Sequence, residues 1–463
     1  MSEPKDLPAL SREELLALVV ELQRQITELR AEIDQLKRGG KRQAAPFSKG
    51  SRVAEPKPPG RKPGSGTFRS REAPPPEAIT EPPVDVRVTL DACPACGGPL
   101  EEERVDFAYW TELPERPRPQ VTQYRVWVCR CTVCGHMVRG QHPDLAPDQT
   151  GATAHRVGAR VMAAAHALHY GVGIPVRKVP AVLHILSGVR LTQGTLTQDA
   201  LRRAAGAVGT AYAQLRAAIP AAPVVYTDDT GWRVRGEPAH LMAFETEAAT
   251  VYQIRPRHRH EEVQEVIPAD YSGVMVTDRG RSYDAQAFAH VRQQKCLAHI
   301  QRSIHDVLES KTGRARDFGE GLKALLQDAV PLWHACRQGT VPDFPTEAKA
   351  LQEELTDQLR DRRLKDLDNQ RLLNELGWHH DRGNLLRFLD DPRIEPTNNR
   401  AERALRPAVI ARKVSQCSKT DRGTHAFEAF TSVVRTLTKQ GIDSLVEGLY
   451  HLFRSPSSQD VPP

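Results

Sequence analysis

The chain has 463 residues, of which 39% are hydrophobic and 26% are charged, so part of its length is expected to be linker rather than packed core. The net charge of +6 comes from one segment, because residues 37–73 carry eleven Lys/Arg against two acids. No apolar stretch is long enough to span a membrane, the first residues lack the order of a secretory signal, and eight cysteines are too few for a disulfide scaffold.

Residues 11–38 carry a heptad repeat of apolar side chains. The d positions are Leu15, Leu22, Leu29 and Leu36, and the a positions are Val19, Ile26 and Ile33. Leu at d with β-branched residues at a favours a parallel two-stranded coiled coil. We therefore predict a leucine zipper that makes a homodimer. The alternative is a single amphipathic helix that packs on its own chain.

Residues 39–83 form a basic linker rich in Pro and Gly. This composition cannot bury enough apolar surface to fold alone. Its Lys and Arg side chains are suited to neutralising phosphates, so the segment is interpreted as a tether to nucleic acid. The alternative is a linker that only keeps the chain soluble.

Residues 84–140 contain two C-x-x-C pairs, each followed by Gly. The cysteines are Cys93, Cys96, Cys131 and Cys134. Four thiolates form a closed tetrahedral site of the structural type, so we predict one Zn²⁺ bound by these residues. Cys129 could compete with Cys131, but only Cys131 completes a C-x-x-C pair. The runs VDFAYW and QYRVWVC between the pairs are expected to be strands.

Residues 151–220 are predicted to be helical. The stretch IPVRKVPAVLHIL and the stretch RLTQGTLTQDALRRAAGA flank a short turn that contains Gly. This pattern is compatible with a DNA-binding helix-turn-helix. Helical pairs of this kind are also common in proteins that do not bind DNA, and the local pattern alone favours that interpretation.

From residue 221 the pattern changes to short apolar runs that end in acidic turns. Asp228 and Asp278 each follow such a run, in the order strand–strand–helix–strand. Glu402 lies in the first turns of a predicted helix that Asn398 or Asn399 can cap. Carboxylate oxygens are the ligands that Mg²⁺ prefers, and two such ions can align an attacking and a leaving oxygen in phosphoryl transfer.

Four segments together resemble the insertion-sequence-sixty-six (IS66) family of transposases. They are YTDDTGWRV, GVMVTDRG, the segment KCLAHIQRSIHD with Cys296, Ala298, His299 and Arg302, and NNRAERALRP. The resemblance covers about residues 85–450. It implies a ribonuclease-H-like core with a D-D-E triad, here Asp228, Asp278 and Glu402, that binds two catalytic Mg²⁺ ions. The family usually has Glu at the position of Asp229, so Asp229 remains an alternative first ligand.

The expected substrate contacts lie beside this triad. Arg403 and Arg406 flank Glu402 and are suited to phosphate, whereas His299 and Arg302 would lie on the helix after the next strand. The long interval before Glu402 predicts a helical insertion at about residues 315–390. The catalytic domain would span residues 221–450, and residues 455–463 would form a disordered tail.

The sequence therefore predicts a multidomain α+β protein that acts as a DNA transposase in the bacterial cytoplasm, associated with the nucleoid. Its partners would be terminal inverted repeats, target DNA, a second copy of the chain and accessory proteins of the same element. A zinc-containing DNA-binding regulator without catalysis is the first alternative, and a nuclease on the same core is the second. A regulator has no use for three converging acids.

Overall fold

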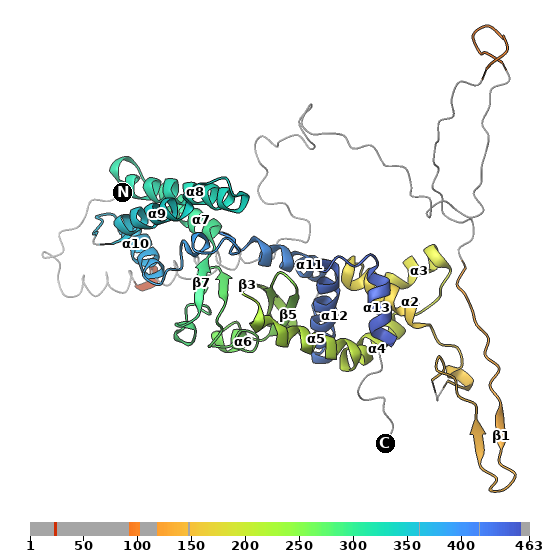
Figure 1. Ribbon diagram of the computed structural model, residues 1–463. Coiled ribbons are helices and arrows are strands. Elements are labelled where there is room, and N and C mark those ends of the chain that lie inside the picture. Colours follow the sequence, from red (N-terminus) through yellow and green to blue (C-terminus); the bar gives the residue numbers. More distant parts are fainter. Residues whose placement is uncertain are drawn as a thin grey trace. The chain divides into compact units, whose positions relative to one another are not determined.

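The computed structural model describes residues 23–25, 92–101, 118–146, 149–360, 362–415 and 417–454 (Figure 1). The chain divides into two units, Met1–Pro114 and Glu115–Pro463. Residues 23–25 of the predicted zipper are helical and exposed. The rest of the zipper, the basic linker, the run VDFAYW and the C-terminal tail lie outside the described residues.

Each C-x-x-C pair forms its own tight turn. The amide of Gly97 donates to the carbonyl of Cys93 at 2.8 Å, and the amide of Gly135 donates to the carbonyl of Cys131 at 2.9 Å. Both glycines have φ of +73°, a left-handed conformation that a side chain would disfavour. The second turn joins the antiparallel strands β1 (Val128–Arg130) and β2 (Met137–Arg139).

A group of helices precedes the large sheet. These helices are α2 (Ala159–His166), α3 (Val179–Ser187), α4 (Gln193–Ala205) and α5 (Ala207–Ala218). Helix α3 ends at Gly188, whose φ of 70° reverses the chain, and Thr192 caps α4 by accepting a hydrogen bond from the amide of Thr195. Asp199 of α4 contacts buried His166 of α2 at 2.9 Å, so a buried polar contact joins the two helices.

The centre of the second unit is a mixed sheet with the strand order β5-β4-β3-β6-β7. The strands are β3 (Val224–Val234), β4 (Glu237–Glu245), β5 (Thr250–Arg255), β6 (Val274–Thr277) and β7 (Arg292–Lys295), with helix α6 (His260–Gln264) between β5 and β6. Strands β3, β4 and β5 are antiparallel neighbours, whereas β6 and β7 run parallel to β3. This mixed sheet with helices fits a ribonuclease-H-like core.

Two details differ from the sequence expectation. Three strands of the large sheet rather than two precede helix α6, because the amide of Thr246 donates to the carbonyl of Ala249 at 2.8 Å and turns the chain between β4 and β5. Asp228 also lies within β3 rather than at its end. The polar residues after it continue the antiparallel pairing with β4 as far as Val234, so strand pairing outweighs the polar composition there.

The two faces of the sheet are covered by different helices. Val224 and Tyr226 of β3 share an apolar cluster with α7 (Leu297–Glu309) and with Ala401 of α11 (Asn399–Ser415). Val225 points the other way and packs with α5 and with α12 (Asp421–Lys439). Because side chains alternate along a strand, even-numbered residues of β3 face α11 and odd-numbered residues face the opposite side.

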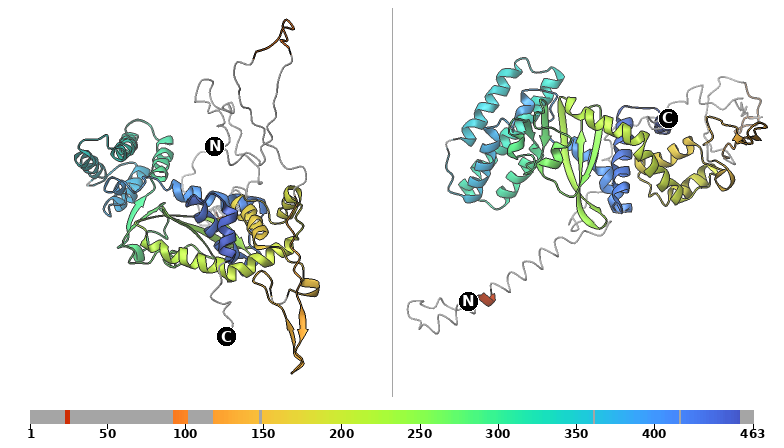
Figure 2. Two further views of the ribbon diagram at one scale, coloured as in Figure 1. Left: turned by 45° about the vertical axis from the view of Figure 1, so that its right-hand side comes forward. Right: turned by 90° about the horizontal axis from the view of Figure 1, so that it is seen from below.

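The remaining helices lie beyond the two edges of the sheet (Figure 2). They are α8 (Asp317–Gln338), α9 (Phe344–Leu359) and α10 (Leu367–His380) on the β7 side, and α13 (Leu445–Arg454), which packs on α2. Helices α8 to α10 occupy the range in which an insertion was predicted. Among the described residues, no helix is both long and apolar enough to cross a membrane.

Candidate active site

Asp228 lies within β3, and Asp278 directly follows the neighbouring strand β6. Strands β3 and β6 are parallel and pair Tyr226 with Val276, so two residues further along each chain the same register brings Asp228 opposite Asp278. Asp228 is two residues from Tyr226 and Asp278 is two residues from Val276, so both aspartates are expected on the face that α11 covers. The amide of Asp229 donates to Asp228 Oδ1 and the amide of Gly280 donates to Asp278 Oδ1, each at 2.8 Å.

Helix α11 is joined to strand β3 at the residue before Asp228. The carbonyl of Asn398 accepts from the amide of Glu402, which starts the helix. Asn398 was one of two candidate caps for this helix, but its side-chain oxygen accepts no hydrogen bond. Its Nδ2 instead donates to the carbonyl of Thr227 at 2.9 Å. Asn398 is fully buried, so this contact fixes the first turn of α11, with Glu402, against β3.

Buried Cys296 connects three segments at the same edge. Its amide donates to the carbonyl of Thr277 at 2.8 Å, and its Sγ accepts from the amide of Asn398 at 3.2 Å. The Sγ of Cys296, a ring nitrogen of His299 and a carboxylate oxygen of Glu402 all lie within 4.8 Å of one another. The residue pattern KCLAH therefore places a thiol and an imidazole next to the predicted third carboxylate.

The three acids influence one another electrostatically. The pKa of Asp228 is raised to about 7, chiefly because the carboxyl is buried. The hydrogen bond from the amide of Asp229 opposes this shift, whereas the charges of Asp278 and Glu402 contribute to it. Within the described parts of the chain no Lys or Arg forms an ion pair with any of the three. A divalent cation bound between the three carboxylates would relieve the repulsion that helps to raise the pKa of Asp228.

The other predicted site residues surround this cluster to different degrees. Contact with Cys296 raises the pKa of His299, and the charges of Glu402 and Asp278 act in the same direction. Arg302, Arg403 and Arg406 are exposed on α7 and α11. Arg403 also lines an open pocket of about 250 Å³ with Arg400, Arg435 and Lys439.

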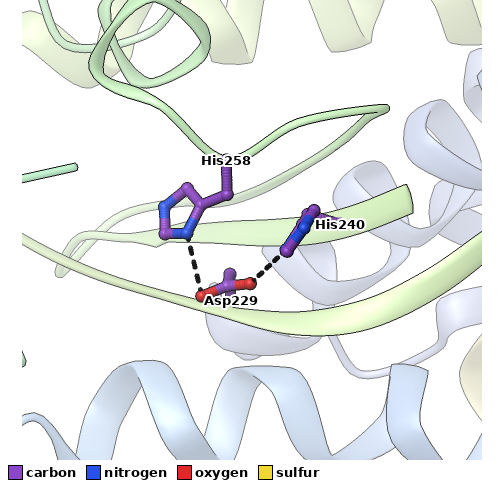
Figure 3. A group of neighbouring side chains, drawn as sticks. All are labelled: Asp229, His240 and His258. Atoms are coloured by element: carbon purple, nitrogen blue, oxygen red, sulfur yellow. Dashed lines mark hydrogen bonds and ion pairs between the residues drawn. The ribbon is translucent and has the colours of Figure 1, made fainter. Parts of the chain in front are cut away.

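Asp229 points to the opposite face of the sheet. His240 Nδ1 lies 2.8 Å from its Oδ2, and His258 Nδ1 lies 3.0 Å from its Oδ1 (Figure 3). Burial alone would raise the pKa of Asp229, but the contacts with His258 and His240 outweigh burial and lower it. Adjacent aspartates of β3 thus have different partners and opposite pKa shifts.

Sequence reasoning missed a buried lysine behind Asp278. Lys295 is fully buried and its Nζ lies 2.7 Å from Asp284 Oδ1. The same Nζ donates to Thr277 Oγ1 at 3.1 Å and to the carbonyl of Asp278 at 3.2 Å. The only signal in the sequence was its place directly before Cys296. His240 and His258 were missed as well, because neither stands in a motif with Asp229.

The two C-x-x-C turns resemble each other closely in geometry. Backbone amides of Ala95 and Cys96 lower the pKa of the Cys93 thiol, and amides of Cys134 and Val133 lower that of Cys131. A thiol whose anion is stabilised by amides is a good ligand for Zn²⁺. Each turn therefore has the donor chemistry of half a zinc site. Cys129 lies on β1, outside the turn, and is exposed.

Comparison with known families gives one match. A family model described as "Transposase IS66 family" matches residues 155–426, which is more than half of the chain. The matched range contains Asp228, Asp278 and Glu402 and stops before the end of α12. No curated protein matches the chain.

Proposed function

The chain belongs to the IS66 transposase family, and from this premise we propose that it is a DNA transposase whose catalytic ligands are Asp228, Asp278 and Glu402. In this proposal two Mg²⁺ ions bind between these carboxylates, and the enzyme cleaves element ends and joins them to target DNA. The observation that carries the proposal is that Asp278, directly after β6, and Glu402, on α11, lie close enough to Asp228 of β3 for their charges to raise its pKa. Oxygen ligands of this kind suit Mg²⁺.

Asp228 is preferred over Asp229 as the first ligand because of the face on which it lies. Asp228 belongs to the face covered by α11, and the charges of Asp278 and Glu402 reach it. Asp229 is occupied by two histidines on the other face.

The bound ions would supply Lewis-acid activation of the attacking oxygen and charge neutralisation at the phosphate. The residues of the chain itself hold the three carboxylates in position. Asn398 holds the start of α11 against Thr227, and Lys295 holds the backbone of Asp278, so the acids need little rearrangement. No activated side-chain nucleophile is required, because water or a DNA 3′-hydroxyl attacks.

DNA would run along the exposed basic side chains of α11 and α7. Arg403 and Arg406 would bind backbone phosphates, with His299 and Arg302 on the neighbouring helix as further contacts. The pocket beside Arg403 supports this path, since Arg435 has a buried Nε without a hydrogen-bond partner there. An anionic oxygen would satisfy that donor.

The test is cleavage and joining of the element's own ends in Mg²⁺, with DNA binding measured on the same proteins. Asp278→Asn and Glu402→Gln keep side-chain shape but remove a ligand charge, so both should abolish cleavage and leave end binding largely intact. Asp270→Asn and Glu247→Gln are matched controls at exposed positions and should behave as the wild type. Cleavage at the wild-type rate in either triad variant would refute the proposal.

The same assay separates the alternatives. A regulator without catalysis would bind the ends but never cleave them, although no observation explains its three converging acids. A nuclease on this core would cleave without joining strands. Joining products from the wild-type chain would exclude both.

We further propose one structural Zn²⁺ bound by Cys93, Cys96, Cys131 and Cys134. The matching turns and lowered thiol pKa values support it. Because structural zinc contributes folding energy directly, Cys131→Ser should lose the metal and become protease-sensitive in residues 84–140. Cys129→Ser is the matched control. If Cys129→Ser lost zinc and Cys131→Ser retained it, Cys129 rather than Cys131 would be the ligand.

The zipper in residues 11–38 is proposed to make a parallel homodimer, which would let two catalytic domains act on both element ends. Its heptad pattern is the support. Deleting residues 1–40 should lower self-association in sedimentation more than it changes metal content. Unchanged sedimentation would show that the helix packs within its own chain.

A further inference from the structure

The face of β3 that lies opposite the catalytic carboxylates carries a second group of metal-binding side chains. Asp229, His240 and His258 each present one ligand atom, and these atoms all lie within 4.8 Å of one another (Figure 3). Two imidazole nitrogens with one carboxylate are a donor set that Zn²⁺ and similar transition metals accept readily. The three residues come from β3, β4 and the loop before α6, so only the folded chain brings them together.

The positions of the ligands follow from the strand register. Gly231 pairs with His240 and Asp229 pairs with Met242, so His240 is the diagonal neighbour of Asp229 on one face of the hairpin. His258 reaches the same point from its loop. The distances of 2.8 and 3.0 Å from Asp229 to the two imidazole nitrogens are close to the spacing of roughly 3.3 Å between neighbouring ligands of a tetrahedral ion with bonds near 2 Å.

Neighbouring residues hold His258 in place, whereas His240 is open to solvent. Ser282 donates to the carbonyl of His258 at 2.8 Å, and the buried ring of Tyr283 packs against the His258 ring with centroids 5.3 Å apart. The side chain of His258 is only 11% exposed, whereas that of His240 is 40% exposed. A metal would therefore meet prearranged ligands and retain a position that faces solvent.

No Lys or Arg among the described residues forms an ion pair with Asp229. Its negative charge has only the two imidazoles as partners, and neutral imidazoles can bind a metal through Nδ1. We propose that Asp229, His240 and His258 form a site for a divalent transition metal of the Zn²⁺ class, separate from the Mg²⁺ site. Mg²⁺ is a poor occupant because it prefers oxygen ligands, so the two faces of β3 would select different ions.

A metal ion bound here would cross-link segments on the face of β3 that lies opposite Asp228. The ion would tie β3 to β4 and to the loop at residues 256–259, and it would hold the residue next to Asp228. The inference does not depend on transposase activity, because metal content can be measured without DNA.

The test is Zn²⁺ content of the full chain after equilibrium dialysis in excess Mg²⁺. Per chain, the wild type should retain one more equivalent of Zn²⁺ than His240→Gln does, and one more than Asp229→Asn does. His260→Gln is the matched control, because His260 contacts one carboxylate, Glu261, and no second imidazole. Equal zinc in the wild type and both cluster variants, or displacement of the extra equivalent by Mg²⁺, would overturn the proposal.

A spectroscopic measurement distinguishes this site from the cysteine turns. With Co²⁺ as probe, the difference spectrum between the wild type and His240→Gln should show ligand-field bands without thiolate charge transfer. Thiolate bands in that difference would assign the lost ion to cysteines and refute the site. Melting of the metal-free proteins checks folding, and His240→Gln should match the wild type there because its ring is half exposed.

Discussion

Two adjacent aspartates lie on opposite faces of strand β3, and their pKa values are shifted in opposite directions. On the α11 face, Asp228 lies among acids without a cation, and its pKa is raised to about 7. On the other face, Asp229 lies between two histidines, and its pKa is lowered. The difference shows that strand alternation and neighbours, rather than residue type, decide which carboxylate is available to a catalytic metal.

The contrast extends to the rest of the second unit. Asp199 on α4 is buried, yet it accepts hydrogen bonds from Arg202 and Arg203, both at 2.7 Å, and contacts His166. Buried acids in this fold are therefore paired where they have a structural role. Asp228 and Asp278 are half-buried and Glu402 is exposed, and none of the three has an ion-pair partner among the described residues, which is why the group is a candidate for function.

The largest effect expected from the contrast is on catalysis. Asp228→Asn removes a proposed metal ligand and should abolish cleavage. Asp229→Asn removes only a neighbour of the site, so its loss should not exceed roughly 10–100-fold. Rates of end cleavage in Mg²⁺ check this, and a greater loss in Asp229→Asn would reverse the assignment of the two faces.

The next largest effect concerns the cation nearest the triad. Lys295 pairs with Asp284, and the other contact of that acid is His379, whose pKa is lowered to about 4, chiefly by burial. Lys295→Met therefore leaves a partly buried acid without a charged partner and should lower the free energy of unfolding by about 3 kcal/mol. The control is Lys349→Met, which removes an exposed pair with Glu353 and should change stability by less than about 0.5 kcal/mol. Urea unfolding measures the free energy of unfolding of both variants. Equal losses would show that the buried pair of Lys295 stabilises the fold no more than the exposed pair of Lys349 does.

A smaller effect is expected from the fully paired acid. Burial opposes ionisation of Asp199, but the contacts from His166, Arg203 and Arg202 outweigh burial and lower its pKa from 3.8 to about 2. A lowered folded-state pKa stabilises the fold above the unfolded pKa, and that contribution is lost as pH falls through the folded value. It amounts to about 2 kcal/mol, lost between roughly pH 4 and pH 2.

Urea unfolding of the wild type and Asp199→Asn tests this contribution. The stability gap between them should be constant above about pH 5 and should narrow as pH falls below 4. A gap independent of pH would mean that Asp199 stabilises the helices through shape rather than charge.

The smallest effect concerns the link between β3 and α11. Asn398→Ala removes the bond to Thr227 and should cost about 1 kcal/mol of stability, together with a fall in the cleavage rate constant. Exposed Asn399 provides the matched control, and Asn399→Ala should leave both quantities unchanged. Loss of stability without a change in rate would mean that Glu402 is positioned by other contacts.

Much of this arrangement could be read from the sequence, and the reasons are local. Apolar runs before Asp228 and Asp278 predicted strands, and the Gly-followed cysteine pairs predicted the tight turns at Gly97 and Gly135. The IS66 resemblance predicted the family that the matched range shows. These features depend on residues close together in the chain.

The features that the sequence did not reveal depend on register and packing. Nothing in the run TDDT says which aspartate faces α11, because that follows from the pairing of Tyr226 with Val276 and from the cluster around Ala401. The contact of Asn398 with Thr227 joins residues that are 171 positions apart. The histidines around Asp229 are likewise brought together by a hairpin and a loop, with no spacing that marks them.

The most direct test of the central claim exchanges one ligand for a softer one. A thiolate binds Mg²⁺ poorly but accepts Mn²⁺, so Asp228→Cys should be inactive for end cleavage in Mg²⁺ and regain activity in Mn²⁺. Asp229→Cys should show no such change of metal preference, because Asp229 faces the histidines. Rescue by Mn²⁺ in Asp229→Cys, and none in Asp228→Cys, would contradict the account.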